Sequence, residues 1–208
     1  QIIMPTLAQM QAQGTPFIGL LYVGLALTST GPKVVEFNVR FGDPETEPLL
    51  SLLESSLASI MLAAAQADLS TIDGLRFRPE YAVGVVLASQ GYPSAPITGR
   101  PITGLTSQDA DVLHAGTRLD GDQLVASGGR VLVVLGHGET LAGARKEAYQ
   151  NISEIQLDGG FHRDDIAAAA AEQEAVAGLA SGNSSHEAPR HAMATPEEPS
   201  YRNTPSTN

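Results

Sequence analysis

Apolar residues follow two different spacings in the first half of the chain. Residues 17–28 are almost wholly apolar, which is typical of a strand that is covered on both faces. A turn at residues 29–32 follows, and residues 33–41 then alternate apolar with polar side chains and predict a second strand. Residues 46–67 carry an apolar stripe at helical spacing and predict one long helix, and residues 5–13 predict a short one. The first half is therefore predicted to be a hairpin flanked by two helices.

The second half predicts short strands followed by a closing helix. Residues 81–88 alternate in the manner of a strand, and a loop rich in glycine and proline follows at residues 91–104. Further strands are predicted at residues 112–115, 123–126 and 130–135. Residues 139–152 predict an amphipathic helix. Because hairpins outnumber crossover connections, the fold class is predicted to be α+β and largely antiparallel in this half.

Composition changes once, near residue 167, and divides the chain. Residues 167–179 are rich in alanine and are predicted to be helical. From Ala180 onward hardly any large apolar residue remains, so this part is predicted to be disordered. The chain is therefore divided into a first domain over residues 1–75, a second over residues 76–167 and a low-complexity tail over residues 168–208.

Overall charge and composition exclude several classes of partner. The chain has 23 acidic and 12 basic residues, a net charge of −11, which argues against binding to the nucleic-acid backbone. The longest apolar stretch, residues 17–27, falls short of the roughly 20 residues of a membrane-spanning helix. The chain has no cysteine, so no disulfide is possible and a cytoplasmic location is expected. It begins with Gln1 and not Met, so a longer parent protein is expected.

The segment KVVEFNVRF, residues 33–41, carries the clearest candidate chemistry. Strand alternation gathers a carboxylate, an amide and a guanidinium on one face, namely Glu36, Asn38 and Arg40. The opposite face is apolar and is predicted to be core, with Val35, Phe37, Val39 and Phe41. Magnesium prefers oxygen ligands that it shares with substrate phosphates, and a guanidinium suits a carboxylate or a phosphate. A metal and anion site is one interpretation, and a solvated polar strand face is the other.

The segment EFNVRFGDPET, residues 36–46, closely resembles the signature of the phosphoribosylamine–glycine ligase family, ATP-grasp enzymes of purine biosynthesis. Residues 40–46 match, and Glu47 stands where Gln or Met is usual. Further likenesses are LAAAQ at 62–66, VVLASQGYP at 85–93, ITGL at 102–105, HAGT at 114–117 and SGGRVL at 127–132. Arg163, Asp165 and Ile166 resemble the closing Arg-x-Asp-Ile-Gly of the family, with Ala167 in place of the glycine. The resemblance covers about residues 1–167.

The resemblance implies a reaction in which glycine, 5-phosphoribosylamine and ATP give glycinamide ribonucleotide, ADP and phosphate. It implies that Glu36 and Asn38 bind Mg²⁺ or Mn²⁺ and that Arg40 is catalytic. The substrate-binding residues it implies are Arg40 and the loop residues Gly42, Asp43, Pro44 and Glu45. Residues 1–75 would then be the end of an ATP-grasp domain, and residues 76–167 the C-terminal ligase domain.

Several features point to an incomplete enzyme. The chain has only Lys33 and Lys146 as lysines, and its glycine-rich loop lacks the Lys-Ser/Thr of a phosphate-binding loop. ATP-binding residues are therefore not assigned, the N-terminal part of the same enzyme is an expected partner, and the chain alone is expected to be inactive. Another ATP-grasp carboxylate–amine ligase, or a non-catalytic lobe that only binds, are the alternatives. The histidines lack the spacing of metal ligands, and no serine–histidine–acid triad is predicted.

Overall fold

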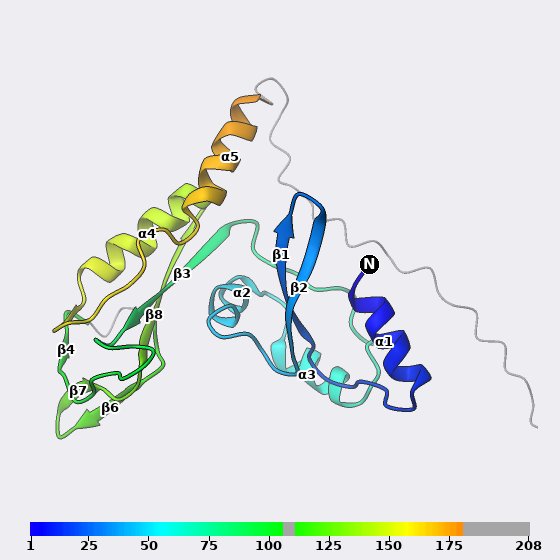
Figure 1. The fold of residues 1–208 in the computed structure, drawn as a ribbon, viewed down its shortest axis with the longest axis horizontal. Coiled ribbons are helices and arrows are strands. Elements are labelled where there is room, and N and C mark those ends of the chain that lie inside the picture. Colours follow the sequence, from blue (N-terminus) through cyan, green and yellow to red (C-terminus); the bar gives the residue numbers. More distant parts are fainter. Residues whose placement is uncertain (106–110, 181–208) are drawn as a thin grey trace, which may run out of the picture.

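The computed structural model describes residues 1–105 and 111–180, and the predicted disordered tail lies outside the described residues from residue 181 onward. Figure 1 shows two groups of elements, joined where the chain leaves α3 and enters β3. The first group contains α1 (Ile3–Ala12), β1 (Tyr22–Thr28), β2 (Gly31–Asn38), α2 (Thr46–Leu52) and α3 (Leu57–Ala65). The mixture of helices with antiparallel strands confirms the predicted α+β class. No helix among the described residues has both the length and the apolar character needed to cross a membrane.

The predicted hairpin forms, but its strands are shorter than the sequence pattern indicates. β1 and β2 pair antiparallel, with Tyr22 opposite Asn38 and Gly24 opposite Glu36. The first strand begins at Tyr22 and not at residue 17, because Gly19 has a φ of +138° that interrupts extended backbone. The second strand ends at Asn38, and the chain bends at Val39 and Arg40. An apolar run therefore extends beyond the paired residues at one end of the hairpin.

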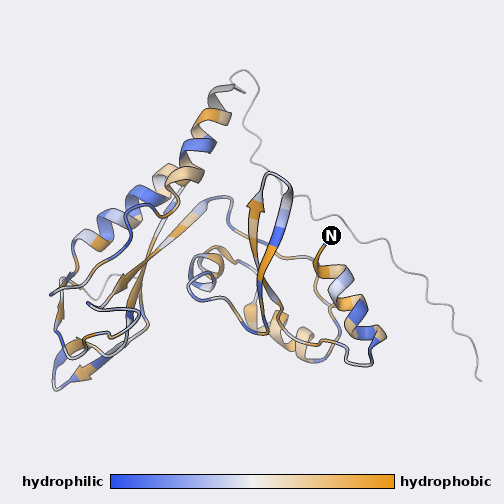
Figure 2. Ribbon diagram, viewed as in Figure 1, coloured by the Kyte–Doolittle hydropathy of each residue, from blue (hydrophilic) through white to orange (hydrophobic). Residues whose placement is uncertain are grey.

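The apolar faces of the hairpin are exposed, which contradicts the prediction that they are covered. Leu27 on β1 is 87% exposed, and Val39 just after β2 is 73% exposed. Val35 and Phe37, predicted to be core, are also exposed. Figure 2 shows apolar residues along both strands, which project away from the helices. The pairing shifts from Glu36–Gly24 to Val34–Leu25, so Val35 is an extra residue and regular alternation does not hold along the whole of β2. The described part of this chain does not cover these apolar residues.

The predicted helix over residues 46–67 is two helices, α2 and α3. Leu53 leaves the helical conformation with a ψ of 119° and forms a β-bridge with Phe77. The backbone N–H of Arg78 donates to the carbonyl of Leu52 at 2.8 Å. Ser56 then caps α3 by accepting a hydrogen bond from the backbone N–H of Ser59. The break is thus caused by pairing with a segment more than twenty residues later, which helical spacing cannot reveal.

The second group is an antiparallel sheet covered by a helix. β3 (Tyr81–Ala88), β8 (Arg130–Gly138) and β5 (Val112–His114) pair in the order β3-β8-β5, and α4 (Leu141–Ser153) packs on β3 and β8. The bounds predicted for β3 are confirmed, whereas β8 continues three residues beyond its predicted end. Most of the core comes from this group, including Val85, Leu132, Val134, Ala144 and Ala148.

Short strand pairs complete the second group. β4 (Ile102–Thr103) pairs with β9 (Gln156–Leu157), and β6 (Thr117–Asp120) pairs with β7 (Gln123–Ala126). Only β7 among these was predicted. Two-residue strands contain no full period of alternation, so the pattern gives no signal for β4 or β9.

The alanine-rich segment forms α5 (Ala168–Ala180), as predicted, and it is joined to α4 by Glu174. The Glu174 carboxylate accepts a hydrogen bond of 2.9 Å from the backbone N–H of Leu141, in the first turn of α4. A hydrogen bond with Glu174 also raises the pKa of the Tyr81 hydroxyl, with burial and the carboxylate charge adding to the shift. One carboxylate therefore connects α5 with both α4 and β3.

We expect Glu174→Ala to lower the free energy of unfolding by about 1 kcal/mol, because a free N–H group at the start of α4 loses its acceptor. Chemical denaturation of the chain measures this change. Glu172 lies on the same helix and is exposed, so Glu172→Ala is the matched control. Equal loss of stability in the two variants would show that the contact with Leu141 contributes nothing.

Candidate active site

Glu36 and Asn38 lie on one face of the hairpin, as strand alternation predicted. Glu36 is opposite Gly24, and its Cγ lies 3.0 Å from the position that a Cβ on Gly24 would occupy. The absence of a side chain at Gly24 therefore leaves room for the stem of Glu36. Asn38 is opposite Tyr22 and is half-buried, whereas Glu36 is exposed. The two oxygen-bearing side chains thus project from neighbouring positions of a single strand face.

Tyr22 joins this group from the facing strand, and sequence analysis did not assign it a role. A hydrogen bond with Glu45 raises the pKa of the Tyr22 hydroxyl, and burial together with the charges of Glu45 and Glu36 adds to the effect, while Arg40 opposes it. Tyr22 is therefore protonated at neutral pH and can donate to the Glu45 carboxylate. The sequence counted Tyr22 as one more apolar strand residue, and only the register of the hairpin would have placed it beside Asn38.

The loop from Gly42 to Glu45 is closely packed at its first residue. Gly42 is buried, and a Cβ there would lie 2.5 Å from Glu45 Oε2 and 3.1 Å from the Tyr22 ring. The Thr46 hydroxyl donates to the Gly42 carbonyl at 2.6 Å, which closes the loop onto the start of α2. The peptide bond between Asp43 and Pro44 is cis. A larger residue at position 42 would crowd Glu45 and Tyr22, so glycine lets these two side chains lie against the loop.

Two arginines, Arg40 and Arg130, form hydrogen bonds at or beside this loop. Arg40 donates to the carbonyl of Phe41 at 2.6 Å and forms no ion pair with any residue that the structure describes. Arg130, from the first position of β8, donates to both the backbone carbonyl and the carboxylate of Asp43. Sequence analysis placed Arg130 at the start of a predicted strand and gave it no role, because nothing local links it to a residue 87 positions earlier.

The residues on the hairpin face fit a hard divalent cation as a partial ligand set. Glu36 and Asn38 offer two oxygen ligands, and such cations take further oxygens from substrate phosphates and water. The amide nitrogen of Asn38 is buried without a hydrogen-bond partner; as a donor it suits an acceptor group of a ligand and not the cation itself. Within the described ranges, no three histidine or acidic side chains come together in a geometry that could hold a metal.

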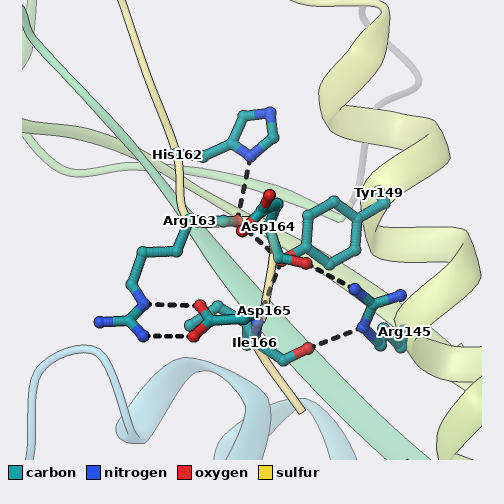
Figure 3. A network of polar contacts seen from close by, with 7 residues as sticks. All are labelled: Arg145, Tyr149, His162, Arg163, Asp164, Asp165 and Ile166. Atoms are coloured by element: carbon teal, nitrogen blue, oxygen red, sulfur yellow. Dashed lines mark hydrogen bonds and ion pairs between the residues drawn. The ribbon is translucent and has the colours of Figure 1, made fainter. Parts of the chain in front are cut away.

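The segment that resembles the closing family motif is attached to α4 (Figure 3). Arg163 and Asp165 form a bidentate pair, which lowers the pKa of the Asp165 carboxyl. The Tyr149 hydroxyl donates to the carbonyl of Arg163 at 2.7 Å. The guanidinium of Arg145 lies 4.6 Å from the centre of the Tyr149 ring and donates to the carbonyl of Ile166. These contacts fix the segment after Phe161 against α4.

The structure also brings a serine, a histidine and an acid together, although sequence analysis predicted no such arrangement. His137 Nε2 lies 2.9 Å from Ser51 Oγ, and its Nδ1 lies 3.5 Å from an Asp111 carboxylate oxygen. The Ser51 hydroxyl donates to the Pro48 carbonyl at 2.8 Å, so its proton points away from His137. The 3.5 Å between His137 Nδ1 and the Asp111 carboxylate is too long for a good hydrogen bond. This cluster therefore joins α2 to β8 and does not form an activated nucleophile.

Comparisons with known proteins agree with the resemblance found in the sequence. The family model described as phosphoribosylglycinamide synthetase, ATP-grasp (A) domain, matches residues 1–46, and the model of the C domain matches residues 82–169. The phosphoribosylamine–glycine ligase of Streptomyces coelicolor is 52% identical over 176 residues, which are 82% of this chain and 42% of that protein. The ligase of Caulobacter vibrioides is 48% identical over 177 residues.

A solved structure supports the same relationship. The crystal structure of phosphoribosylamine–glycine ligase from Thermotoga maritima matches with a TM-score of 0.69 and 37% identity, and covers 77% of this chain and 40% of that chain. The chain thus spans about two fifths of the length of these relatives. Two models of one family, in the order of its domains, together match more than half of the chain, and the chain belongs to the phosphoribosylglycinamide synthetase family.

Proposed function

We propose that the protein containing this chain joins glycine to 5-phosphoribosylamine at the expense of ATP, giving glycinamide ribonucleotide, ADP and phosphate. The observation that carries the proposal is the continuity of the hairpin face with the loop after it. Glu36, Asn38 and Arg40 lead directly into the buried turn at Gly42, and Glu45 returns to Tyr22. Family membership with relatives named for this ligation supports the assignment.

Each group on the hairpin has a role in this proposal. Glu36 and Asn38 hold Mg²⁺ or Mn²⁺, which when bound neutralises phosphate charge. Arg40, which has no described ion-pair partner, is the catalytic cation and binds the glycine carboxylate. The loop from Gly42 to Glu45 binds the amine substrate, and the Tyr22 hydroxyl holds the Glu45 carboxylate in place. Phosphoryl transfer depends mainly on such positioning and charge neutralisation.

We further propose that residues 1–75 end an ATP-grasp domain whose remainder lies in the unmatched part of the relatives. The exposed apolar faces of the hairpin support this division, since a complete domain would cover them. The same remainder would supply the grip on the triphosphate, for which this chain offers few lysines. The cytoplasm is the proposed compartment, in line with a sequence without cysteine.

The chain by itself is expected to release no ADP in response to glycine, because nucleotide, metal and two substrates must meet in one cleft. A coupled ADP assay with glycine and freshly generated phosphoribosylamine measures this. Adding a separately produced N-terminal part is expected to restore the reaction. Turnover by the chain alone near 1 s⁻¹, about the low end of ordinary enzyme rates, would refute the need for a second part. A complete protein without glycine-dependent ADP release would refute the ligase assignment.

A further inference from the structure

Arg130 makes the most specific contact between the two groups of elements. Its Nη1 donates to the backbone carbonyl of Asp43 at 2.9 Å, and its Nη2 donates to the Asp43 carboxylate at 2.9 Å. A guanidinium that binds the main chain and the side chain of one residue fixes both the position and the orientation of that residue. The bound residue lies at the centre of the loop proposed to bind substrate.

The strand that carries Arg130 contains an irregularity at this residue. Leu87 pairs with Leu132, but Ala88 pairs with Arg130, so Val131 is an extra residue on β8. Neighbouring residues of β3 face opposite sides of the sheet, so their partners Leu132 and Arg130 do so too. In a regular strand, two residues that lie two positions apart would share one side. The bulge therefore places Arg130 on the side of the sheet opposite to Leu132. Bulges often change the direction of a side chain in this way beside functional sites.

The turn before Arg130 is held rigidly in place. Ser89, only 2% exposed, donates from its backbone N–H to the Gly129 carbonyl at 2.8 Å and from its hydroxyl to the Gly128 carbonyl at 2.9 Å. A Cβ on Gly129 would lie 2.4 Å from the Tyr92 ring. The base of the Arg130 side chain is thus anchored by hydrogen bonds and by close packing. The ion pair itself is partly exposed, with the Arg130 and Asp43 side chains 36% and 53% exposed, so the fixed geometry of Arg130 comes from its backbone.

The other end of the contact is connected to the proposed site at short range. Asp43 follows the buried Gly42, whose missing side chain lets Glu45 approach, and Glu45 in turn hydrogen-bonds with Tyr22. A displacement of Asp43 would therefore be transmitted to Glu45 and to the hairpin face. Among the described residues, the Arg130 side chain bonds to Asp43 and to neither of the two proposed metal ligands, so it acts through Asp43.

We propose that Arg130 is a positioning residue of the second group that holds the Asp43 loop of the hairpin in its substrate-binding position. The inference rests on the proposed function for its effect on turnover, but the contact itself does not depend on it. Lysine at this position keeps the charge and loses the two-pronged geometry. The structure of the site thus depends on a residue outside the ATP-grasp part of the chain.

The kinetic test compares Arg130→Ala and Arg130→Lys with Arg118→Ala in the complete protein. Arg118 is a matched control because it pairs with Asp120 on the same short strand, within the second group. Arg130→Ala is expected to lower kcat by about 10²-fold, as for a displaced reacting group, and to leave the KM for ATP unchanged. Arg130→Lys is expected to lower kcat by a smaller factor than Arg130→Ala. Free guanidinium, added to Arg130→Ala at non-denaturing concentrations, is expected to restore part of the activity. Unchanged kcat in Arg130→Ala would overturn the proposal.

A second measurement on the 208-residue chain separates this inference from the proposed reaction. NMR relaxation of the backbone amides of Asp43 and Glu45 is expected to report order parameters of about 0.85 in the unaltered chain and below about 0.6 in Arg130→Ala. Arg118→Ala is expected to leave them unchanged. Suppose that the loop loses order in Arg130→Ala while the complete protein shows no glycine-dependent turnover. The proposed reaction is then refuted, and the positioning role of Arg130 stands. A loop that stays rigid in Arg130→Ala would refute the positioning role alone.

Discussion

Glu36→Ala in the complete protein is expected to lower kcat by about 10²- to 10³-fold, the range seen when one electrostatic contact to the reacting groups is removed. The substitution removes a carboxylate ligand and a negative charge from the proposed metal site, so the Mg²⁺ concentration for half-maximal rate is also expected to rise. Glu36 is exposed, so the free energy of unfolding should change by less than about 1 kcal/mol. Steady-state rates measured against Mg²⁺, with thermal denaturation in parallel, test both parts.

Glu54→Ala is the matched control for this prediction, because Glu54 is an exposed glutamate in the same group of elements. Its backbone N–H contacts Arg76 and is unaffected by the substitution. Rates for Glu36→Ala within about twofold of the unaltered protein at modest Mg²⁺ would mean that Glu36 is only a solvated residue of a strand. That result would favour the non-catalytic interpretation of the polar strand face.

Gly136→Ala is expected to have the largest effect on stability, a loss of about 3 kcal/mol. The Cβ would lie 2.2 Å from the backbone nitrogen of Ala148 and 2.4 Å from the carbonyl oxygen of Ala144. Both neighbours belong to the backbone of α4, so the whole helix would have to move away from the sheet. The core residues between them would then lose their packing. Urea denaturation of the chain measures the loss.

Gly84→Ala provides the comparison, since Gly84 lies in the paired strand opposite Leu135. A Cβ there would meet the flexible end of Leu135, at Cδ2, at 3.3 Å, and the Pro48 Cδ at 3.4 Å, which is an ordinary van der Waals distance. We expect a change below about 1 kcal/mol. Similar losses for Gly136→Ala and Gly84→Ala would show that close contact between α4 and β8 does not limit stability.

Sequence pattern predicted best those elements whose pattern and environment lie within the chain. β3 is covered by α2 and α4, so its alternation appeared as a strand with the correct ends. α4 begins two residues later and ends one residue later than predicted. The hairpin was found as well, but its exposed faces could not be predicted, because a periodic pattern records which side is apolar and not which chain covers it.

The candidate site was predictable where its residues are consecutive and not where folding brings them together. Glu36 and Asn38 share a strand face, as their spacing in the sequence predicts, whereas Arg40 lies in the bend after β2 and not on that face. Tyr22 joins them through hairpin register, and Arg130 reaches the loop through a bulge on a distant strand. Neither a register nor a bulge has a signature in the spacing of apolar residues.

The position of α2 affects how the parts of this family can be exchanged. α2 lies in the first group of elements, yet its Ser51 contacts His137 and its Pro48 lies near Gly84, both in the second group. Recombination between relatives at the predicted boundary near residue 75 would therefore pair one parent's α2 and Asp43 loop with another parent's β3, β8 and Arg130. We expect functional chimaeras to need these contact positions inherited as a set, so that the unit of exchange spans both groups of elements.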